Sequence, residues 1–250
     1  ADYHSKKQRG RHYRPAEQHG LDLNDEFEWL VNPFPILPHH FTIASKNHRP
    51  QRILDAYDAM IQATLALPEE YIVFYNGPKC GASAPDHAHL QAVRSADIPL
   101  LEAIAAGEFA FGEPLCDIEE SCIYNVKGYV VPFFMIKSNK VSHSVELLER
   151  LLAALPVVAD ELEPRMNVIS YYAPGKGFVT IVLPRAEHRP ACYCTTGECG
   201  HMVSPGTLDM AGLVVTPLEK DFNGIDAGEA MSMLREVALS DEAFESIVEK

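Results

Sequence analysis

The chain has 250 residues, of which 47% are hydrophobic and 22% charged, which is enough for a substantial core and typical of a globular protein. Its formal net charge of −14 argues against non-specific binding to nucleic acid or anionic membranes, although an acidic protein can contain a locally positive pocket. No apolar run approaches the ~20 residues of a membrane-spanning helix. The N-terminal segment lacks the apolar core of a signal peptide, and six cysteines are too few for a disulfide scaffold, so we expect reduced thiols in the cytoplasm.

The first part of the sequence predicts several short strands and two helices that alternate with them. Residues 1–20 are charged and have few apolar anchors, which is typical of a flexible arm. Prolines divide the apolar stretch 27–45 into two strands joined by a turn. The helical spacing of apolar residues predicts a helix over 49–67, ended by Pro68, and a shorter helix follows over 99–106. Further strands are predicted over 71–77, 86–93, 121–126 and 129–137.

The second part predicts a long helix, a hairpin and two C-terminal helices. The helix covers 142–162, and the apolar runs 166–172 and 177–184 flank a Gly-rich turn that is typical of a hairpin. The remaining predictions are a strand over 212–217 and helices over 226–239 and 240–250. This mixture of strands and helices favours an α+β fold with a largely antiparallel sheet.

A short internal repeat suggests a duplication. Residues 41–51 and 179–191 both contain a strand, a polar turn and then His-Arg-Pro, so that His48 and His188 hold matching places. We therefore expect two fused halves, with a chance match as the alternative. The predicted division is an arm over 1–20, a first half over 21–140, and a degenerate second half over 141–250 that includes the C-terminal helices.

The run GASAPDHAHLQAV (81–93) carries the strongest chemical signal. In a strand, His87, His89 and Gln91 would share one face, opposite Ala88 and Leu90. Three adjacent polar side chains are costly to bury unless they are hydrogen-bonded or functional. A neutral imidazole can attack phosphorus near neutral pH, which favours group-transfer chemistry. A solvated surface strand is the alternative.

The preceding loop, NGPKCGAS (76–83), contains the parts of a cradle for a phosphate. Glycines permit close backbone approach, and backbone amides, a Lys and a Ser can donate hydrogen bonds. The residues expected to contact substrate here are Asn76, Gly77, Lys79, Gly81 and Ser83. Other candidates for binding an anionic substrate, each with a solvated surface role as the alternative, are Lys46, Arg49, Arg185, His188 and Arg189.

Residues 31–48, VNPFPILPHHFTIASKNH, followed by HAHLQ, resemble the histidine-triad superfamily, in which an Asn-x-Phe-Pro turn and a strand ending in His precede His-x-His. Gln91 is similar to the transferase branch, which contains galactose-1-phosphate uridylyltransferase, diadenosine tetraphosphate phosphorylase and the sugar-nucleotide phosphorylases; the hydrolase branch has a third His there. The resemblance is specific over 27–93, and 204–217 is similar to the degenerate second half of the phosphorylases. It implies a histidine-triad-like antiparallel sheet with flanking helices, with 21–140 as the catalytic half.

The resemblance also implies roles for individual residues. His89 would be the nucleophile that forms a nucleotidyl-histidine, the backbone carbonyl of His87 would hold its imidazole, and Gln91 would bind the phosphoryl group. Asn32 would belong to the nucleotide-binding turn, with Phe34 and Pro35 forming part of the base pocket.

The implied function is a nucleotidyltransferase or nucleotide phosphorylase. Its substrate would be a dinucleoside polyphosphate or nucleotide sugar, its acceptor phosphate or a sugar phosphate, and no cofactor would be needed for the chemistry. The alternatives are a nucleotide hydrolase of the same fold and a non-catalytic nucleotide-binding protein. We expect a monomer or a homodimer that binds neither nucleic acid nor membranes.

Two groups of residues bear on a structural zinc ion. In the uridylyltransferases a Cys-x-x-Cys pair and two histidines hold zinc, and His48 and His87 match those histidines. No Cys precedes Asn32 in this sequence, so a tight site is not expected there. A rival cluster, of uncommon spacing, is Cys192, Cys194, Cys199 and His201.

Overall fold

The computed structural model describes residues 20–96, 98–196 and 200–249. The arm predicted over 1–20 therefore lies outside the described residues, apart from Gly20. Among the described residues, no helix is both long and apolar enough to cross a membrane.

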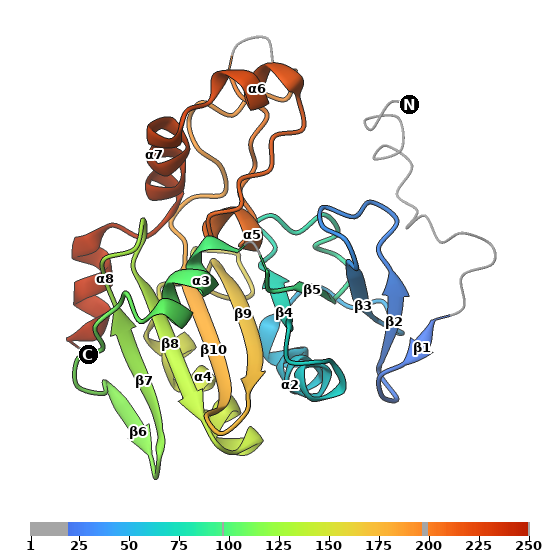
Figure 1. Cartoon of the computed structure of the whole chain (residues 1–250), viewed down its shortest axis with the longest axis vertical. Coiled ribbons are helices and arrows are strands. Elements are labelled where there is room, and N and C mark those ends of the chain that lie inside the picture. The colour runs from blue at the N-terminus through green and yellow to red at the C-terminus, as the bar shows by residue number, and fades with distance from the viewer. Residues whose placement is uncertain (1–19, 97, 197–199, 250) are drawn as a thin grey trace.

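One mixed-length antiparallel sheet forms the centre of the molecule (Figure 1). Its spatial order is β1-β2-β3-β5-β4-β9-β10-β8-β7-β6. The strands are β1 (Leu21–Asp22), β2 (Phe27–Val31), β3 (Phe41–Ser45), β4 (Tyr71–Asn76), β5 (His89–Arg94), β6 (Cys116–Ile118), β7 (Ser121–Val126), β8 (Phe133–Ser138), β9 (Met166–Ala173) and β10 (Gly177–Pro184).

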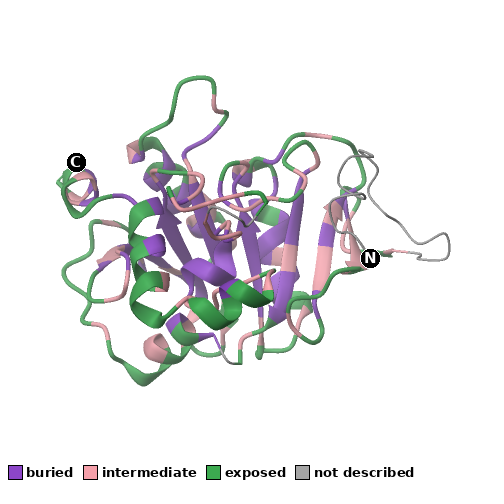
Figure 2. Cartoon of the chain, turned by 90° about the horizontal axis from the view of Figure 1, so that it is seen from above, coloured by how far each residue is buried: buried purple, intermediate pink, exposed green. Residues whose placement is uncertain are grey.

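Helices cover both faces of this sheet and bury its central strands, as Figure 2 shows. One apolar core lies between the sheet and α2, α4 and α8, and the other lies between the opposite face and α3, α5 and α7. The helical elements are η1 (Ile53–Asp55), α2 (Tyr57–Ala66), α3 (Pro99–Ala106), α4 (Val141–Ala154), α5 (Thr207–Met210), α6 (Glu219–Gly224), α7 (Ala227–Val237) and α8 (Asp241–Val248). The predicted α+β class is confirmed.

The order of the strands repeats within the sheet. The first half is arranged as β2-β3-β5-β4 and the second as β7-β8-β10-β9, and each has a short hairpin strand, β1 or β6, at its outer end. The halves join where β4 pairs antiparallel with β9, with Tyr75 opposite Val168. The predicted duplication is therefore present in the topology, with the repeat beginning at β6. The proposed division at residue 140 stays a prediction, because strands from both sides of that residue belong to the same sheet.

The sequence repeat that suggested the duplication does not connect equivalent strands of the two halves. By strand order β3 corresponds to β8 and β10 corresponds to β5. The segments carrying His48 and His188 follow β3 and β10, so these two histidines do not occupy equivalent places.

Three predicted elements differ from the structure. The helix over 49–67 is confined to η1 and α2, because the segment before η1 is extended and its backbone bonds to Pro85 and Ala88, just before β5. The helix over 142–162 ends at Ala154, since Leu155 adopts an extended conformation just before Pro156. Residues 212–217 form a loop in which the carboxylate of Asp209 accepts a hydrogen bond from Val215 N.

Candidate active site

The two histidines of the motif lie in different local structures. β5 begins at His89, and His87 belongs to the preceding turn, where its N–H donates to the carbonyl of Ala84. The prediction that both lie on one strand face was therefore wrong, because the turn redirects the chain before the ladder begins. His89 and Gln91 do share a face of β5, whereas Leu90 is fully buried on the other.

A hydrogen bond orients the imidazole of His89. Its Nδ1 lies 2.9 Å from the carbonyl oxygen of His87. A carbonyl can only accept, so Nδ1 carries the proton, and in the neutral ring Nε2 then carries the lone pair. The contact between this ring and this carbonyl is the one that the family resemblance implies. His89 is buried, with 8% of its surface exposed. The hydrogen bond to the carbonyl of His87 holds the ring in the tautomer that a nucleophile acting through Nε2 requires.

The backbone of His89 is clamped by Gln51, a residue that the sequence did not single out. Its Oε1 accepts from His89 N at 2.8 Å, and its Nε2 donates to the carbonyls of His89 at 2.9 Å and Asn76 at 3.0 Å. Gln51 is fully buried. One amide group thus ties the start of β5 to the end of β4. Its only signal in the sequence is its place directly after the His-Arg-Pro run.

The amide of Gln91 is oriented by His40, a residue that the sequence analysis did not single out. Ile36 N donates to His40 Nδ1 at 3.1 Å, so in the neutral ring Nε2 bears the proton and donates to Gln91 Oε1 at 2.8 Å. Burial lowers the pKa of His40, which keeps the ring neutral. Because Oε1 is engaged as an acceptor, the amide nitrogen is the end of Gln91 that can donate to a ligand.

The turn between β2 and β3 encloses a pocket of about 490 Å³. Asn32 shapes the turn, because its Oδ1 accepts from Phe34 N at 2.9 Å. Pro35 lines the pocket together with residues 36–41, whereas Phe34 is 51% exposed and lies outside the lining. His40 lines this pocket and contacts Gln91, so the pocket lies beside the β5 site.

The Gly-rich loop after β4 divides into buried and exposed parts. Asn76 is buried, and its Oδ1 accepts from the backbone N–H and the hydroxyl of Thr207 at 2.7 and 2.8 Å, so the fold itself uses this oxygen. A Cβ on Gly77 would lie 2.8 Å from the carbonyl of Met166, so that glycine is required for packing. Lys79 and Ser83 are the exposed polar side chains of the loop.

Gly81 brings the Gly-rich loop against the second half of the chain. It has a φ of +93°, and a Cβ there would lie 2.5 Å from Gly206 Cα. The loop is therefore packed against residues 205–206 and is not an isolated surface turn.

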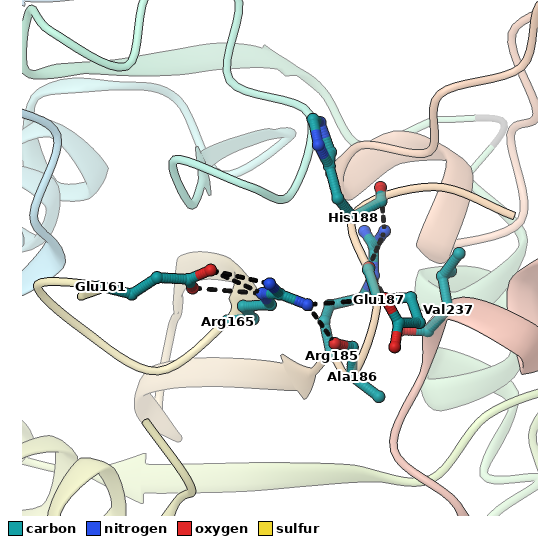
Figure 3. A network of polar contacts seen from close by, with 7 residues as sticks. All are labelled: Glu161, Arg165, Arg185, Ala186, Glu187, His188 and Val237. Carbon is teal, nitrogen blue, oxygen red and sulfur yellow. Dashed lines mark hydrogen bonds and ion pairs between the residues drawn. The ribbon is translucent and has the colours of Figure 1, made fainter. Parts of the chain in front are cut away.

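Arg185 is the hub of a buried polar network, shown in Figure 3. Its Nε donates to the carbonyl of Val237, and its two terminal nitrogens donate to Asn167 Oδ1 and to the carbonyls of Pro205, Glu187 and His188. All five N–H groups are thus used inside the protein, and none remains for an anionic substrate. Two other predicted candidates are engaged in ion pairs, Lys46 with Asp22 and Arg49 with Glu26.

The candidate metal ligands are only partly brought together. His48 Nδ1 and His87 Nδ1 are 3.2 Å apart, and His87 Nε2 donates to the carbonyl of Ser45 at 2.8 Å. Over the described ranges, no group of three or more His, Cys, Asp or Glu residues is arranged to hold a metal ion. A structural zinc ion stays a prediction.

The rival cysteine cluster lies partly outside the described residues, because Cys199 is not among them. His201 is engaged elsewhere: Asp221 Oδ1 lies 2.9 Å from its Nδ1 and Glu229 Oε1 lies 3.0 Å from its Nε2. As placed, both ring nitrogens contact carboxylates.

Comparison with known families assigns both parts of the chain. Residues 113–250 match the model described as "GDPGP1-like, C-terminal domain", and residues 7–94 match a domain of unknown function, DUF4922. The first match covers more than half of the chain. The chain belongs to the GDPGP1-like family.

Individual relatives agree with this assignment. Diadenosine 5',5'''-P1,P4-tetraphosphate phosphorylase 2 of Saccharomyces cerevisiae is 32% identical in an alignment 118 residues long, which covers 38% of this chain and 36% of that protein. The chain thus matches about a third of the relative's length. The crystal structure of yeast Ap4A phosphorylase Apa2 superposes with a TM-score of 0.61 and 20% identity, covering 91% of this chain and 78% of that one.

A second structure of that enzyme, in complex with Ap4A, gives a TM-score of 0.57 at 18% identity over 86% of this chain and 74% of that one. These likenesses show the fold. They confirm the predicted fold class. The family match and the curated relative confirm the predicted resemblance to nucleotide phosphorylases.

Proposed function

We propose that this protein is a nucleotide phosphorylase or nucleotidyltransferase that acts through a covalent nucleotidyl-His89. The observation that carries the proposal is the 2.9 Å contact between His89 Nδ1 and the carbonyl of His87, because it fixes the tautomer with a lone pair on Nε2. Membership of the GDPGP1-like family and similarity to a curated phosphorylase support the reaction class.

The first step transfers the nucleotidyl group to the enzyme. Nε2 of His89 attacks the α-phosphorus, the N–P bond forms, and the P–O bond to the leaving nucleotide or sugar phosphate breaks. The ring becomes cationic as it bonds to phosphorus, and the carbonyl of His87 stabilises that charge through the Nδ1–H bond. The amide nitrogen of Gln91, oriented by His40, donates to the phosphoryl oxygens.

The second step regenerates the enzyme. An oxygen of orthophosphate or of a sugar phosphate attacks the same phosphorus, and the N–P electron pair returns to Nε2. The substrate is a dinucleoside polyphosphate or a nucleotide sugar. Support for a nucleotide comes from the yeast Ap4A phosphorylase structures, which are described as complexes with Ap4A and with AMP.

The pocket beside the site is suited to the nucleoside portion. It is lined mostly by apolar side chains of residues 31–41, and it adjoins Gln91 through His40. A base in this pocket would place its α-phosphate toward β5. The predicted roles of Asn32 and Pro35 in binding the nucleotide belong to this proposal, whereas Phe34 would contact a base only from the exposed rim.

The test is isolation of the covalent intermediate. Wild-type protein is incubated with α-labelled diadenosine tetraphosphate or a labelled nucleotide sugar without phosphate and then denatured at alkaline pH, since phosphohistidine bonds are labile in acid. We expect label on wild type and none on His89→Ala. His143→Ala on α4 is the matched control, because this histidine contacts Ser121 far from β5, and it should label normally.

The products separate the alternatives. Phosphate-dependent release of a nucleoside diphosphate identifies a phosphorylase, release of a nucleoside monophosphate without phosphate identifies a hydrolase, and binding without turnover identifies a nucleotide-binding protein. Near-normal turnover by His89→Ala would refute the covalent mechanism.

A further inference from the structure

Two cations near the Gly-rich loop lack acidic partners on a chain with a net charge of −14. Most cations of the described residues are paired, as in Lys140 with Glu119 and Arg150 with Glu146. Over the same ranges, Lys79 and Arg189 form no ion pair with a carboxylate. Arg189 instead donates from Nε to Ser204 Oγ at 3.0 Å, and its guanidinium lies 4.1 Å from the ring centre of Tyr193.

The two cations converge on His188, although they come from different halves of the molecule. Burial and, to a smaller extent, the positive charges of Arg189 and Lys79 together lower the pKa of His188 to about 4, with further contributions from Arg185 and Arg165. The imidazole is therefore neutral at physiological pH and can donate a hydrogen bond from one nitrogen. In Figure 3 its side chain points away from the guanidinium of Arg185.

The segments that carry these side chains are held rigidly. Arg185 donates to the carbonyl of His188 at 3.0 Å and to the carbonyl of Pro205 at 3.0 Å, so one buried guanidinium fixes the backbone beside both Arg189 and Ser204. Gly81, two residues after Lys79, packs directly against Gly206. The positive groups are thus positioned by the fold before any ligand arrives, which lowers the cost of binding an anion.

The Gly-rich loop that carries Lys79 starts next to the reaction centre. Gln51 Nε2 donates both to the carbonyl of His89 and to that of Asn76, the residue from which the Gly-rich loop starts. Lys79 lies three residues further along, in a turn closed by the bond from Cys80 N to the carbonyl of Gly77. A ligand held by Lys79 and Arg189 would therefore lie where the Gly-rich loop meets residues 204–206 of the second half.

We propose that Lys79, His188, Arg189 and Ser204 form the subsite that binds the acceptor phosphate of the second step. Lys79 and Arg189 supply positive charge, and Ser204 and His188 supply neutral donors, a combination that suits a tetrahedral phosphate dianion. This assignment rests on the proposed function. The bound phosphate oxygen attacks the α-phosphorus, forming a P–O bond as the N–P bond to His89 breaks.

The test measures orthophosphate binding directly, by calorimetry, in wild type and in Lys79→Gln and Arg189→Gln. We expect each substitution to weaken phosphate binding by about tenfold or more, the loss typical of one charge-assisted hydrogen bond. Arg189→Lys should recover part of the affinity, which excludes misfolding as the cause. Lys176→Gln is the matched control, because Lys176 is an exposed lysine in the turn between β9 and β10 with no ion pair to a described residue, and it should bind as wild type does.

A second measurement separates this inference from the proposed function. The rate at which nucleotidyl-His89 is discharged is followed against the concentration of orthophosphate in one arm and of a sugar 1-phosphate in the other. The acceptor is the compound whose half-saturating concentration rises in Lys79→Gln and Arg189→Gln.

The phosphate subsite and the covalent mechanism can each be refuted independently of the other. Normal labelling of His89 with phosphate affinities within twofold of the control would overturn the subsite and leave the function standing. Weakened phosphate binding in both variants, in a protein that never becomes labelled, would sustain the subsite and overturn the covalent mechanism.

Discussion

Replacing Gln51 by Leu tests whether the clamp on His89 stabilises the fold as well as the site. The substitution leaves three buried backbone groups without the partner they now have: the N–H and carbonyl of His89 and the carbonyl of Asn76. Each such loss costs about 1–3 kcal/mol, and the added apolar contact of Leu offsets about 1 kcal/mol. We therefore expect the free energy of unfolding to fall by about 2 kcal/mol or more.

This loss is measurable by urea unfolding. Trp29 is the only tryptophan and lies on β2, next to β3, so its fluorescence reports on the half that contains the site. A protein of ordinary stability, about 5–15 kcal/mol, would remain folded, which allows labelling of His89 to be assayed in the same variant. We expect slower labelling, because the start of β5 is no longer tied to β4.

Gln62→Leu is the matched control. Gln62 is a half-buried glutamine on α2 whose side chain, among the described residues, bonds to the side chains of Asn24 and Asp58. Its replacement should cost at most about 1 kcal/mol, because the atoms it leaves can be hydrated. If Gln51→Leu lowers the free energy of unfolding no more than Gln62→Leu does, the proposed clamp is refuted. The position of His89 is then fixed by the strand ladder alone.

Two further predictions concern His40 and Glu163. His40→Phe removes the donor that orients Gln91, so turnover should fall about tenfold or more, and adding Gln91→Ala should cost little beyond Gln91→Ala alone; additive losses in this double-mutant cycle would contradict the coupling. Burial raises the pKa of Glu163 from 4.5 to about 7, so between those pH values the native state keeps a proton that the unfolded chain has lost, and stability should fall as pH rises, by on the order of 3 kcal/mol. Urea unfolding at several pH values should show this slope in wild type and not in Glu163→Gln.

The sequence was informative about the site wherever the chemistry is local. His89 and Gln91 are two residues apart, so their shared face follows from the strand alone. The residues that orient them could not be found in this way. Gln51 and His40 reach β5 across 38 and 51 residues, and no spacing rule connects positions that only the tertiary fold brings together.

The fold was predictable in class and less so in detail. The apolar runs of β4, β9 and β10 are long enough to identify strands, whereas β1 and β6, with two and three residues, are too short to show any alternation. Arg185 was a reasonable candidate for an anion ligand because a lone Arg carries no sequence signal of burial. Its five carbonyl and amide partners come from four segments of the second half, which only the structure reveals.

The antiparallel join between β4 and β9 makes the two halves mutually dependent. All of β4 except Tyr71 is buried, and β9 supplies one of its two neighbours. A fragment ending after β5 would present that apolar strand as an open edge, the kind of surface that recruits another chain. Two copies of such a fragment could pair β4 with β4 and rebuild the centre of the sheet about a true twofold axis. The present chain achieves this arrangement within a single polypeptide, so β10, the counterpart of β5, need not carry the same side chains as β5.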